Sequence, residues 1–229
     1  METKFHSMPS VFVMEHDVSP EMVTDLNLYL DNYLKQKKRK SLAGTLVGQI
    51  KKGQQLLMDH EDKKIVEFSN MLCGLGAHYI NEFSRATGAT YKTNKQVAMD
   101  ELWSVHSYER DYNPIHSHGT KTLMGISATM WTKVPQQILD QPTAGTSEYN
   151  LYNSSGHSDG CLAFQYGQGH VTDNELLKPS PSFVVRPEVG KLYLFPSWLQ
   201  HMVYPFQGKG ERRTVAANLN CWEVQQEAA

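Results

Sequence analysis

The strongest constraint on the fold is a change in the character of the chain near Val97. From there onward, short runs of β-prone residues alternate with turn-forming glycine, proline, asparagine and serine. The predicted strands cover residues 97–108, 123–134, 161–166, 182–186, 191–195, 202–204 and 213–223. Short strands at this spacing are typical of a β-sandwich or a β-barrel. We therefore expect residues 97–224 to form a closed double sheet of the jelly-roll type.

The first 96 residues carry helical signals instead, preceded by an apolar run at residues 11–13 that is a possible strand. Ser19, Pro20 and Glu21 form a helix start, with a capping residue, a proline at the first helical position and an acid in the first turn. Apolar residues then recur at helical spacing as far as Leu34. A second helix is predicted over residues 61–86, closed by Gly88. We expect residues 1–96 to be a helical support for the β core, within one domain that spans residues 1–229.

Composition sets outer limits on the function. The chain has 229 residues, 40% of them hydrophobic and 20% charged, which fits a globular protein with a substantial core. A net charge of −2 makes nucleic acid an unlikely partner. We interpret the basic run at residues 35–40 as a complement to the end of the first helix. Three widely spaced cysteines and the lack of a signal-peptide pattern or a long apolar run predict a cytoplasmic protein without a membrane span.

Three histidines are candidate metal ligands. His116 and His118 are two residues apart, so in an extended chain their side chains point to the same face. His201 follows the apolar run 192–195 and a Pro-Ser turn, at the start of a predicted strand. Each histidine taken alone is equally typical of an exposed loop. Taken together, they predict that three imidazoles converge on one metal ion.

An arginine and a threonine supply a candidate carboxylate site. Residues 212–218 form the strand that follows a Gly208–Gly210 turn. Period-two alternation places Arg212 and Thr214 on one face of that strand. A guanidinium with a hydroxyl two residues away suits a carboxylate, which the arginine binds bidentately and the hydroxyl binds through one further hydrogen bond.

The motifs His-x-His, Gly-x-Leu-x-x-Phe-Pro-Ser-Trp-Leu-x-His and Arg-x-Thr occur in this order. Together they resemble the 2-oxoglutarate and Fe(II)-dependent dioxygenase superfamily. The chain is most similar to a small group of such oxygenases in phages and bacteria, with a prolyl-hydroxylase-like core. The resemblance extends over residues 103–222 and includes Tyr108 and the run Asn113-Pro114-Ile115 before the first histidine.

The resemblance implies a fold and a set of roles. The fold would be a double-stranded β-helix, as in cupins, preceded by helices. His116 and His201 match the iron-binding histidines, and Arg212 and Thr214 match the pair that holds the distal carboxylate of 2-oxoglutarate. Tyr108 is a candidate hydrogen-bond donor to the co-substrate. The implied cofactors are Fe(II), 2-oxoglutarate and O₂, and the implied products are succinate, CO₂ and an oxidised substrate.

The sequence departs from the superfamily at His118, where most members have Asp or Glu. Three interpretations are open: His118 is itself a ligand, Asp111 or Glu109 supplies the carboxylate, or the metal site is incomplete. We favour the first, because the spacing of two residues already places His118 beside His116.

The leading functional hypothesis is a 2-oxoglutarate-dependent Fe(II) dioxygenase that hydroxylates a protein side chain such as proline, a free amino acid or a nucleobase. One alternative is a cupin-type enzyme that uses three histidines without 2-oxoglutarate, which would leave Arg212 and Thr214 without a co-substrate to hold. Another is a non-catalytic jelly-roll protein, such as a virion or binding module. The sequence leaves the prime substrate and the oligomeric state open.

Overall fold

The computed structural model describes residues 11–50, 53–89, 95–140, 158–169, 173, 175 and 177–223. Its elements, in chain order, are β1 (Met14–Asp17), α1 (Pro20–Lys35), the 3₁₀ helix η1 (Ala43–Thr45), β2 (Gln54–Leu57), α2 (Val66–Thr87), β3 (Lys95–Ser107), β4 (Asn113–His116), β5 (Met124–Lys133), α3 (Gln136–Leu139), β6 (Leu162–Gln165), β7 (Ser182–Val185), β8 (Lys191–Pro196), β9 (Gln200–Val203) and β10 (Arg212–Glu223).

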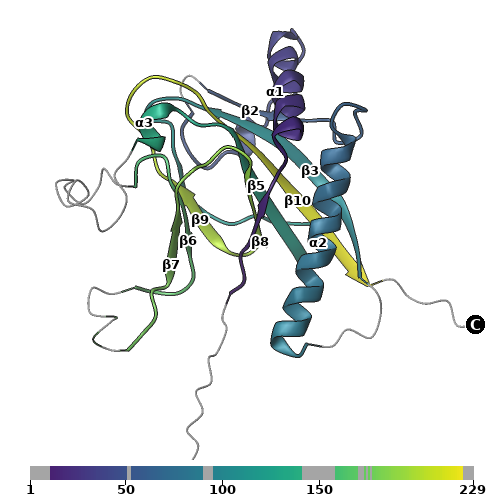
Figure 1. The fold of residues 1–229 in the computed structure, drawn as a ribbon, viewed down its shortest axis with the longest axis vertical. Helices are drawn as coiled ribbons and strands as arrows, with labels where there is room; N and C mark the ends of the chain where they lie inside the picture. The colour runs from purple at the N-terminus through teal and green to yellow at the C-terminus, as the bar shows by residue number, and fades with distance from the viewer. Residues whose placement is uncertain are drawn as a thin grey trace, which may run out of the picture.

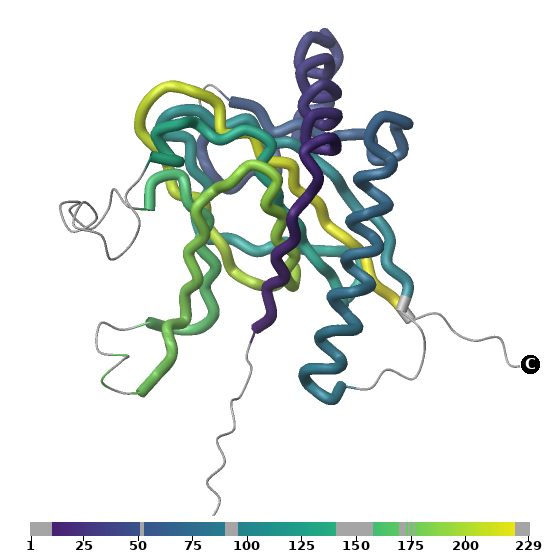
Figure 2. Tube along the Cα trace, viewed as in Figure 1, coloured from purple at the N-terminus to yellow at the C-terminus, as the bar shows by residue number. Residues whose placement is uncertain are grey.

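The strands form two antiparallel sheets. The larger has the order β1-β8-β5-β10-β3-β2 and the smaller has the order β4-β9-β6-β7. Strands far apart in sequence are neighbours: β1 runs along β8, and β10 lies between β5 and β3 (Figures 1 and 2). The predicted mainly-β core with helices in the N-terminal part is confirmed.

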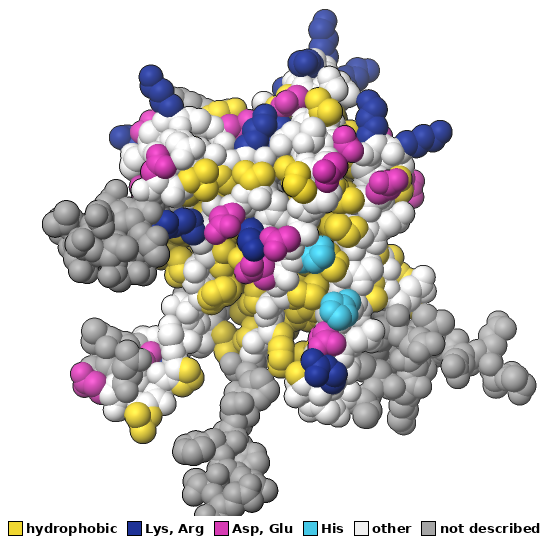
Figure 3. Space-filling model, viewed as in Figure 1, with side chains coloured by type: hydrophobic (Ala, Val, Ile, Leu, Met, Phe, Trp, Pro, Cys, Tyr) yellow, Lys and Arg dark blue, Asp and Glu magenta, His cyan; other side chains and the backbone are white. Residues whose placement is uncertain are grey.

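Helix α1 begins and ends as predicted. The Ser19 hydroxyl accepts a hydrogen bond from the Met22 backbone N–H at 3.3 Å, as a helix cap does. At the other end, Nη1 of Arg39 donates to the carbonyls of Leu34 and Gln36, at 2.6 and 2.8 Å. Lysine and arginine side chains gather over this end of α1 (Figure 3). These contacts agree with the interpretation of the basic run as a complement to the helix end.

Five elements differ from the sequence-based expectation. Helix α2 begins at Val66 rather than residue 61, because Asp62 accepts the Lys64 backbone N–H in a local turn. Strand β1 begins after the expected apolar run 11–13. Strands β2 and β4 were not predicted: β2 opens with two glutamines, and β4 contains Pro114, which argues against a strand. The short helix α3 was not predicted either.

Two apolar clusters bracket the larger sheet. Helices α1 and α2 contribute Leu26, Leu30, Phe68 and Leu72 to a cluster that also contains Ile126, Leu194 and Leu219 from β5, β8 and β10. A second cluster, from the other side of the sheet and the smaller sheet, contains Trp131, Leu162, Phe164, Tyr193, Phe195 and Leu199. The helices therefore cover one face of the larger sheet, and the second face turns toward the smaller sheet (Figure 1). Among the described helices, none has both the length and the apolar character needed to span a membrane.

Candidate metal centre

Strand pairing brings the three predicted histidines together. Strands β4 and β9 are antiparallel neighbours, and His116 and His201 are partners in their register. His118 follows β4, and its backbone N–H donates to the carbonyl of Ser197, in the turn that precedes β9, at 2.9 Å. Two segments about eighty residues apart in sequence thus meet at one place because their strands are adjacent.

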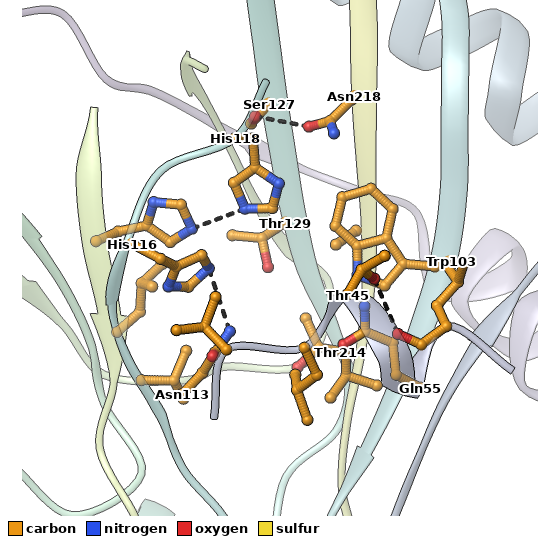
Figure 4. A pocket seen from close by; sticks show the side chains of 18 of the residues that line it. Thr45, Gln55, Trp103, Asn113, His116, His118, Ser127, Thr129, Thr214 and Asn218 are labelled. Carbon is orange, nitrogen blue, oxygen red and sulfur yellow. Dashed lines mark hydrogen bonds between the residues drawn. The ribbon is translucent and has the colours of Figure 1, made fainter. Parts of the chain in front are cut away.

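The ligand atoms of the three histidines all lie within 4.8 Å of one another. Nε2 of His118 is 3.1 Å from Nε2 of His201, and the rings of His116 and His201 have centroids 4.3 Å apart. Figure 4 shows His116 and His118 pointing toward the same space. Among the described residues, this is the only group of three or more histidine, cysteine or carboxylate side chains with such spacing.

Backbone carbonyls fix which nitrogen faces the centre. Nδ1 of His116 lies 2.7 Å from the carbonyl oxygen of Pro114, and Nδ1 of His201 lies 3.0 Å from that of Leu199. Because a carbonyl only accepts, each Nδ1 must carry the proton. In the neutral rings Nε2 then has the lone pair, as a metal ligand held by a backbone carbonyl requires.

Burial keeps the imidazoles neutral. It lowers the pKa of His118 to about 4 and that of His201 to about 3, and the neighbouring His116 adds to both shifts. Burial also lowers the pKa of His116. At neutral pH all three rings therefore keep lone pairs that a cation can use.

The candidate carboxylates lie elsewhere. Asp111 is buried, and its Oδ2 accepts the backbone N–H of Tyr108 at 2.9 Å. Glu109 accepts the backbone N–H of Gly208 at 3.1 Å. Neither belongs to the histidine group. The structure thus brings together the three histidines and leaves both acids outside.

Arg212 is buried, with 3% of its surface exposed. Its Nη1 donates to the carbonyls of Gly160 and Tyr204, at 2.8 and 3.2 Å, while its Nε is buried without a hydrogen-bond partner. Burial lowers the pKa of Arg212 to about 10, so the group stays cationic at neutral pH. A buried cation with an unsatisfied N–H is costly unless a ligand completes it.

One cavity of about 270 Å³ joins these groups. Alternate residues of β10 line this cavity, as predicted: Arg212, Thr214, Ala216 and Asn218. Figure 4 shows Thr214, Thr129 and Trp103 from three neighbouring strands around this space. Part of the wall comes from the segment at residues 41–50, which we call the strap.

Tyr108 is not brought to the site. It is absent from the described residues that line the cavity. Burial raises the pKa of its phenol, and the charges of Glu211, Arg213 and Asp111 are close enough to contribute. Glu211 and Arg213 flank Arg212 and point to the opposite face of β10. We therefore assign Tyr108 no role in co-substrate binding.

Two residues beside the histidines were given no role from the sequence. Trp103 stacks on His118, with ring centroids 5.5 Å apart and planes at 24°. Nδ2 of Asn113 lies 3.1 Å from Nε2 of His116. Trp103 alternates with Val105 and Ser107 on the cavity face of β3, so the period-two pattern could have indicated it. Asn113 was noted only as part of the run Asn113-Pro114-Ile115 that resembles the superfamily.

A protein family described as "Putative 2OG-Fe(II) oxygenase", where 2OG is 2-oxoglutarate, matches the chain over residues 101–218. This chain belongs to that family. The matched segment contains the three histidines, Arg212 and Thr214. Family membership implies Fe(II) and 2-oxoglutarate as cofactor and co-substrate.

Solved structures of similar fold support the same architecture for the oxygenase. A prolyl-4-hydroxylase from Pseudomonas putida has a TM-score of 0.54 at 13% identity, covering 90% of this chain and 91% of that one. AviO1 from Streptomyces viridochromogenes has a TM-score of 0.53 at 11% identity, covering 90% and 88%. HygX from Streptomyces hygroscopicus, solved with nickel and 2-oxoglutarate, has a TM-score of 0.53 at 8% identity, covering 90% and 82%. No curated protein matches the chain.

The residues of the oxygenase fit the groups that its family uses. Three neutral imidazoles are good ligands for Fe(II), and each offers a ring nitrogen within 4.8 Å of the other two. The unsatisfied Nε of Arg212 fits an anionic co-substrate in the same cavity. The donor set differs from two histidines and a carboxylate only in the third ligand.

Proposed function

We propose that this oxygenase binds Fe(II) through His116, His118 and His201 and 2-oxoglutarate through Arg212 and Thr214, and hydroxylates a small uncharged group of its prime substrate. One observation carries the proposal: the neutral imidazoles of buried His201 and partly buried His116 and His118 share a cavity with a buried guanidinium whose Nε lacks a partner. The family supplies the chemistry when iron, co-substrate and O₂ are bound, with release of succinate and CO₂.

The protein's own groups prepare this chemistry. The Pro114 and Leu199 carbonyls hold His116 and His201 with Nε2 toward the centre, so little reorganisation accompanies metal binding. The three imidazoles are neutral, so they leave the full positive charge of a bound metal to act on an anionic ligand.

Arg212 binds the distal carboxylate of the co-substrate in the proposal. Its Nη1 is fixed by two carbonyls, which leaves Nε to donate to an anion in a water-poor environment. Thr214 is two residues further on the same face and adds a hydroxyl donor. The charge-assisted bond is stronger here than at the surface, because the effective dielectric is lower.

The aliphatic lining of the strap favours a substrate group that carries no charge. It presents Leu42, Leu46, Val47 and Ile50 to the cavity. It is also held in place: Gln49 and Tyr112 exchange two backbone hydrogen bonds of 3.1 Å. An aliphatic wall favours a side chain such as proline, on a protein or a free amino acid, over a nucleobase, whose polar edges need hydrogen-bond partners.

The test is reconstitution with Fe(II) under anaerobic conditions, followed by O₂ and 2-oxoglutarate, with succinate measured. The wild type should release succinate, and Arg212→Met should lose most of this activity through weaker co-substrate binding. The exposed Arg85→Met on α2 is the matched control and should behave as wild type. Wild-type succinate release that survives Arg212→Met unchanged would refute the assignment of the co-substrate site.

The all-histidine donor set supports one second candidate, a cupin-type metalloenzyme that does not use 2-oxoglutarate. It predicts metal binding without succinate formation and no affinity for 2-oxoglutarate. The partnerless Nε of Arg212 argues for the first proposal, because this enzyme would have no carboxylate to place there. A non-catalytic binding module predicts no metal uptake at all, so metal content separates it from both.

A further inference from the structure

Arg213, the neighbour of Arg212, is 1% exposed and points to the other side of β10. Its guanidinium donates to Glu211 at 2.9 and 3.0 Å, to Asp31 at 2.7 Å and to Asn27 at 3.1 Å. Asn27 and Asp31 belong to α1 and lie one helical turn apart. We propose that this group of residues, the α1 clamp, positions Arg212 and Thr214 for 2-oxoglutarate. The clamp consists of Asn27, Asp31, Lys133, Glu211 and Arg213. The inference rests on the proposed role of Arg212.

The clamp lies where the sheet is irregular. Arg213 pairs with Lys133 on β5, but Thr214 pairs with Trp131, so Thr132 is skipped in the register. An extra residue on one strand leaves a group unpaired and bends the strand. This irregularity falls between Arg213 and Thr214, within the motif assigned to the co-substrate. Backbone pairing to β5 is therefore weakest where the two side chains need fixed positions.

Helix α1 replaces the missing sheet contacts. Nδ2 of Asn27 donates to the carbonyl of Thr132 at 2.9 Å, while its Oδ1 accepts from Arg213. Asp31 accepts from Nη2 of Arg213 and from Nζ of Lys133, at 2.7 and 3.2 Å. Two side chains on one face of the helix thus hold β5 and β10 together at the irregularity.

Glu211 extends the clamp to β3. Its Oε1 lies 2.6 Å from Nδ1 of His106, whose Nε2 lies 3.0 Å from the hydroxyl of Ser104. These distances are those of a serine-histidine-acid triad. Ser104 and His106 are 0% and 2% exposed, so no substrate can reach them. The arrangement holds strands together instead of performing hydrolysis.

The alternation of side chains along β10 links the clamp to the orientation of Arg212. Successive side chains on a strand point to opposite faces. Glu211 and Arg213 are held on the outer face, so Arg212 between them must point into the cavity. No clamp residue belongs to the described lining of the cavity, so these are positioning residues.

The experiment compares 2-oxoglutarate and metal affinity in the same variants. Calorimetry on the full chain loaded with Mn(II) measures binding of 2-oxoglutarate, and a separate titration measures Mn(II). Asp31→Asn and Arg213→Met should weaken 2-oxoglutarate binding about tenfold and leave Mn(II) affinity within about twofold. Arg213→Lys should restore part of the loss, because it keeps one cationic donor. Arg85→Met, which removes an exposed pair, should change neither affinity.

The outcomes separate the two levels of the proposal. If Arg212→Met weakens 2-oxoglutarate binding but folded Asp31→Asn and Asn27→Ala bind it as wild type does, the clamp has no positioning role and the function stands. If Arg212→Met itself binds normally, the proposed function fails first. Equal losses of metal and co-substrate affinity, or a lower melting temperature alone, mean a purely structural role. Should Arg213→Met not fold, the half-exposed Asp31 provides the decisive variant.

Discussion

His118 occupies the position where most of the superfamily that the chain resembles carries a carboxylate. Its imidazole is 3.1 Å from that of His201, while Asp111 and Glu109 bond to backbone N–H groups elsewhere. A neutral third ligand gives the site one negative charge less than a carboxylate does. With His118 as the proposed third ligand, the identity of one side chain would set the net charge around the metal.

The first prediction concerns that ligand. His118→Ala should lower metal affinity by more than about a hundredfold. This is a larger loss than the one usually seen when a residue that only hydrogen-bonds to a metal ligand is mutated. Asp111→Asn should keep the metal, because its carboxylate lies outside the histidine group. Metal content of the purified, reconstituted variants measures both. Metal loss in Asp111→Asn with retention in His118→Ala would support the carboxylate interpretation instead.

A second prediction at the residue scale concerns Trp103, which stacks on His118. Trp103→Leu removes the flat surface that restrains the imidazole. Mn(II) affinity should therefore fall about tenfold, as it does when other residues that orient a metal ligand are mutated. Trp103→Phe keeps an aromatic face and should lose less. Calorimetric titration with Mn(II) measures the difference. Equal affinities for the Leu variant and the wild type would show that stacking does not support the ligand.

At the scale of elements, the site depends on contacts between segments without regular pairing. The strap approaches the segment before β4 so closely that Gly48 has no room for a side chain. An added Cβ would lie 2.1 Å from the carbonyl oxygen of Tyr112 and 2.7 Å from Cα of Asn113. Glycine is thus required for this wall to reach the cavity.

Gly48→Ala should therefore destabilise the protein by about 1–3 kcal/mol, as overpacking does. The matched control is Gly44→Ala in the same strap, where an added Cβ meets nothing within 4 Å. Urea unfolding measures both. A stability of Gly48→Ala equal to that of the control would mean that the strap moves away at no cost.

The contact between α1 and β10 predicts a dependence of stability on pH. Burial raises the pKa of the Glu211 carboxyl, but hydrogen bonds from His106 and Arg213 outweigh it and bring the pKa to about 2, from an ordinary 4.5. Because the pKa of Glu211 is lower in the folded than in the unfolded protein, its ionised carboxylate stabilises the fold at pH values above about 4.5. This contribution is lost as the pH falls from about 4.5 toward about 2. Its size is on the order of 3 kcal/mol.

Glu211→Gln tests this dependence. The difference in unfolding free energy between wild type and variant should be large at about pH 7 and should shrink at about pH 3. Glu82→Gln, which alters an exposed pair with Arg85, should show no comparable change. A difference that stays constant with pH would show that the charge of Glu211 adds nothing to the fold.

At the scale of the whole molecule, the helical segment and the β core share one apolar cluster. Leu30 of α1 and Leu72 of α2 are almost fully buried, in a cluster with Leu194 of β8 and Leu219 of β10. Neither segment can keep these surfaces from water alone. We therefore propose that residues 1–96 and 97–224 form one domain.

One domain should unfold in one step. Far-ultraviolet circular dichroism reports mainly on the helices, whereas tryptophan fluorescence reports on Trp103, Trp131, Trp198 and Trp222, all after residue 96. The two probes should give coincident urea transitions. Two separate midpoints would show that the helices fold independently of the β core.

Local patterns in the sequence determined much of this protein. Alternation along residues 212–218 was enough to place Arg212 and Thr214 on one face, and the spacing of His116 and His118 was enough to direct both toward one place. The cap at Ser19 marked the start of α1. These features depend only on backbone geometry within a few residues, so they can be inferred from the chain itself.

The tertiary structure alone decided which distant segments meet. The pairing of β4 with β9 brought His116 to His201. Strand β4 was not predicted, because Pro114 argues against a strand. Packing of α1 brought Asn27 and Asp31 to the irregularity beside Arg212. Such contacts depend on strand order and on the combined packing of many side chains. A periodic pattern reports which face a residue occupies, but not which partner covers that face.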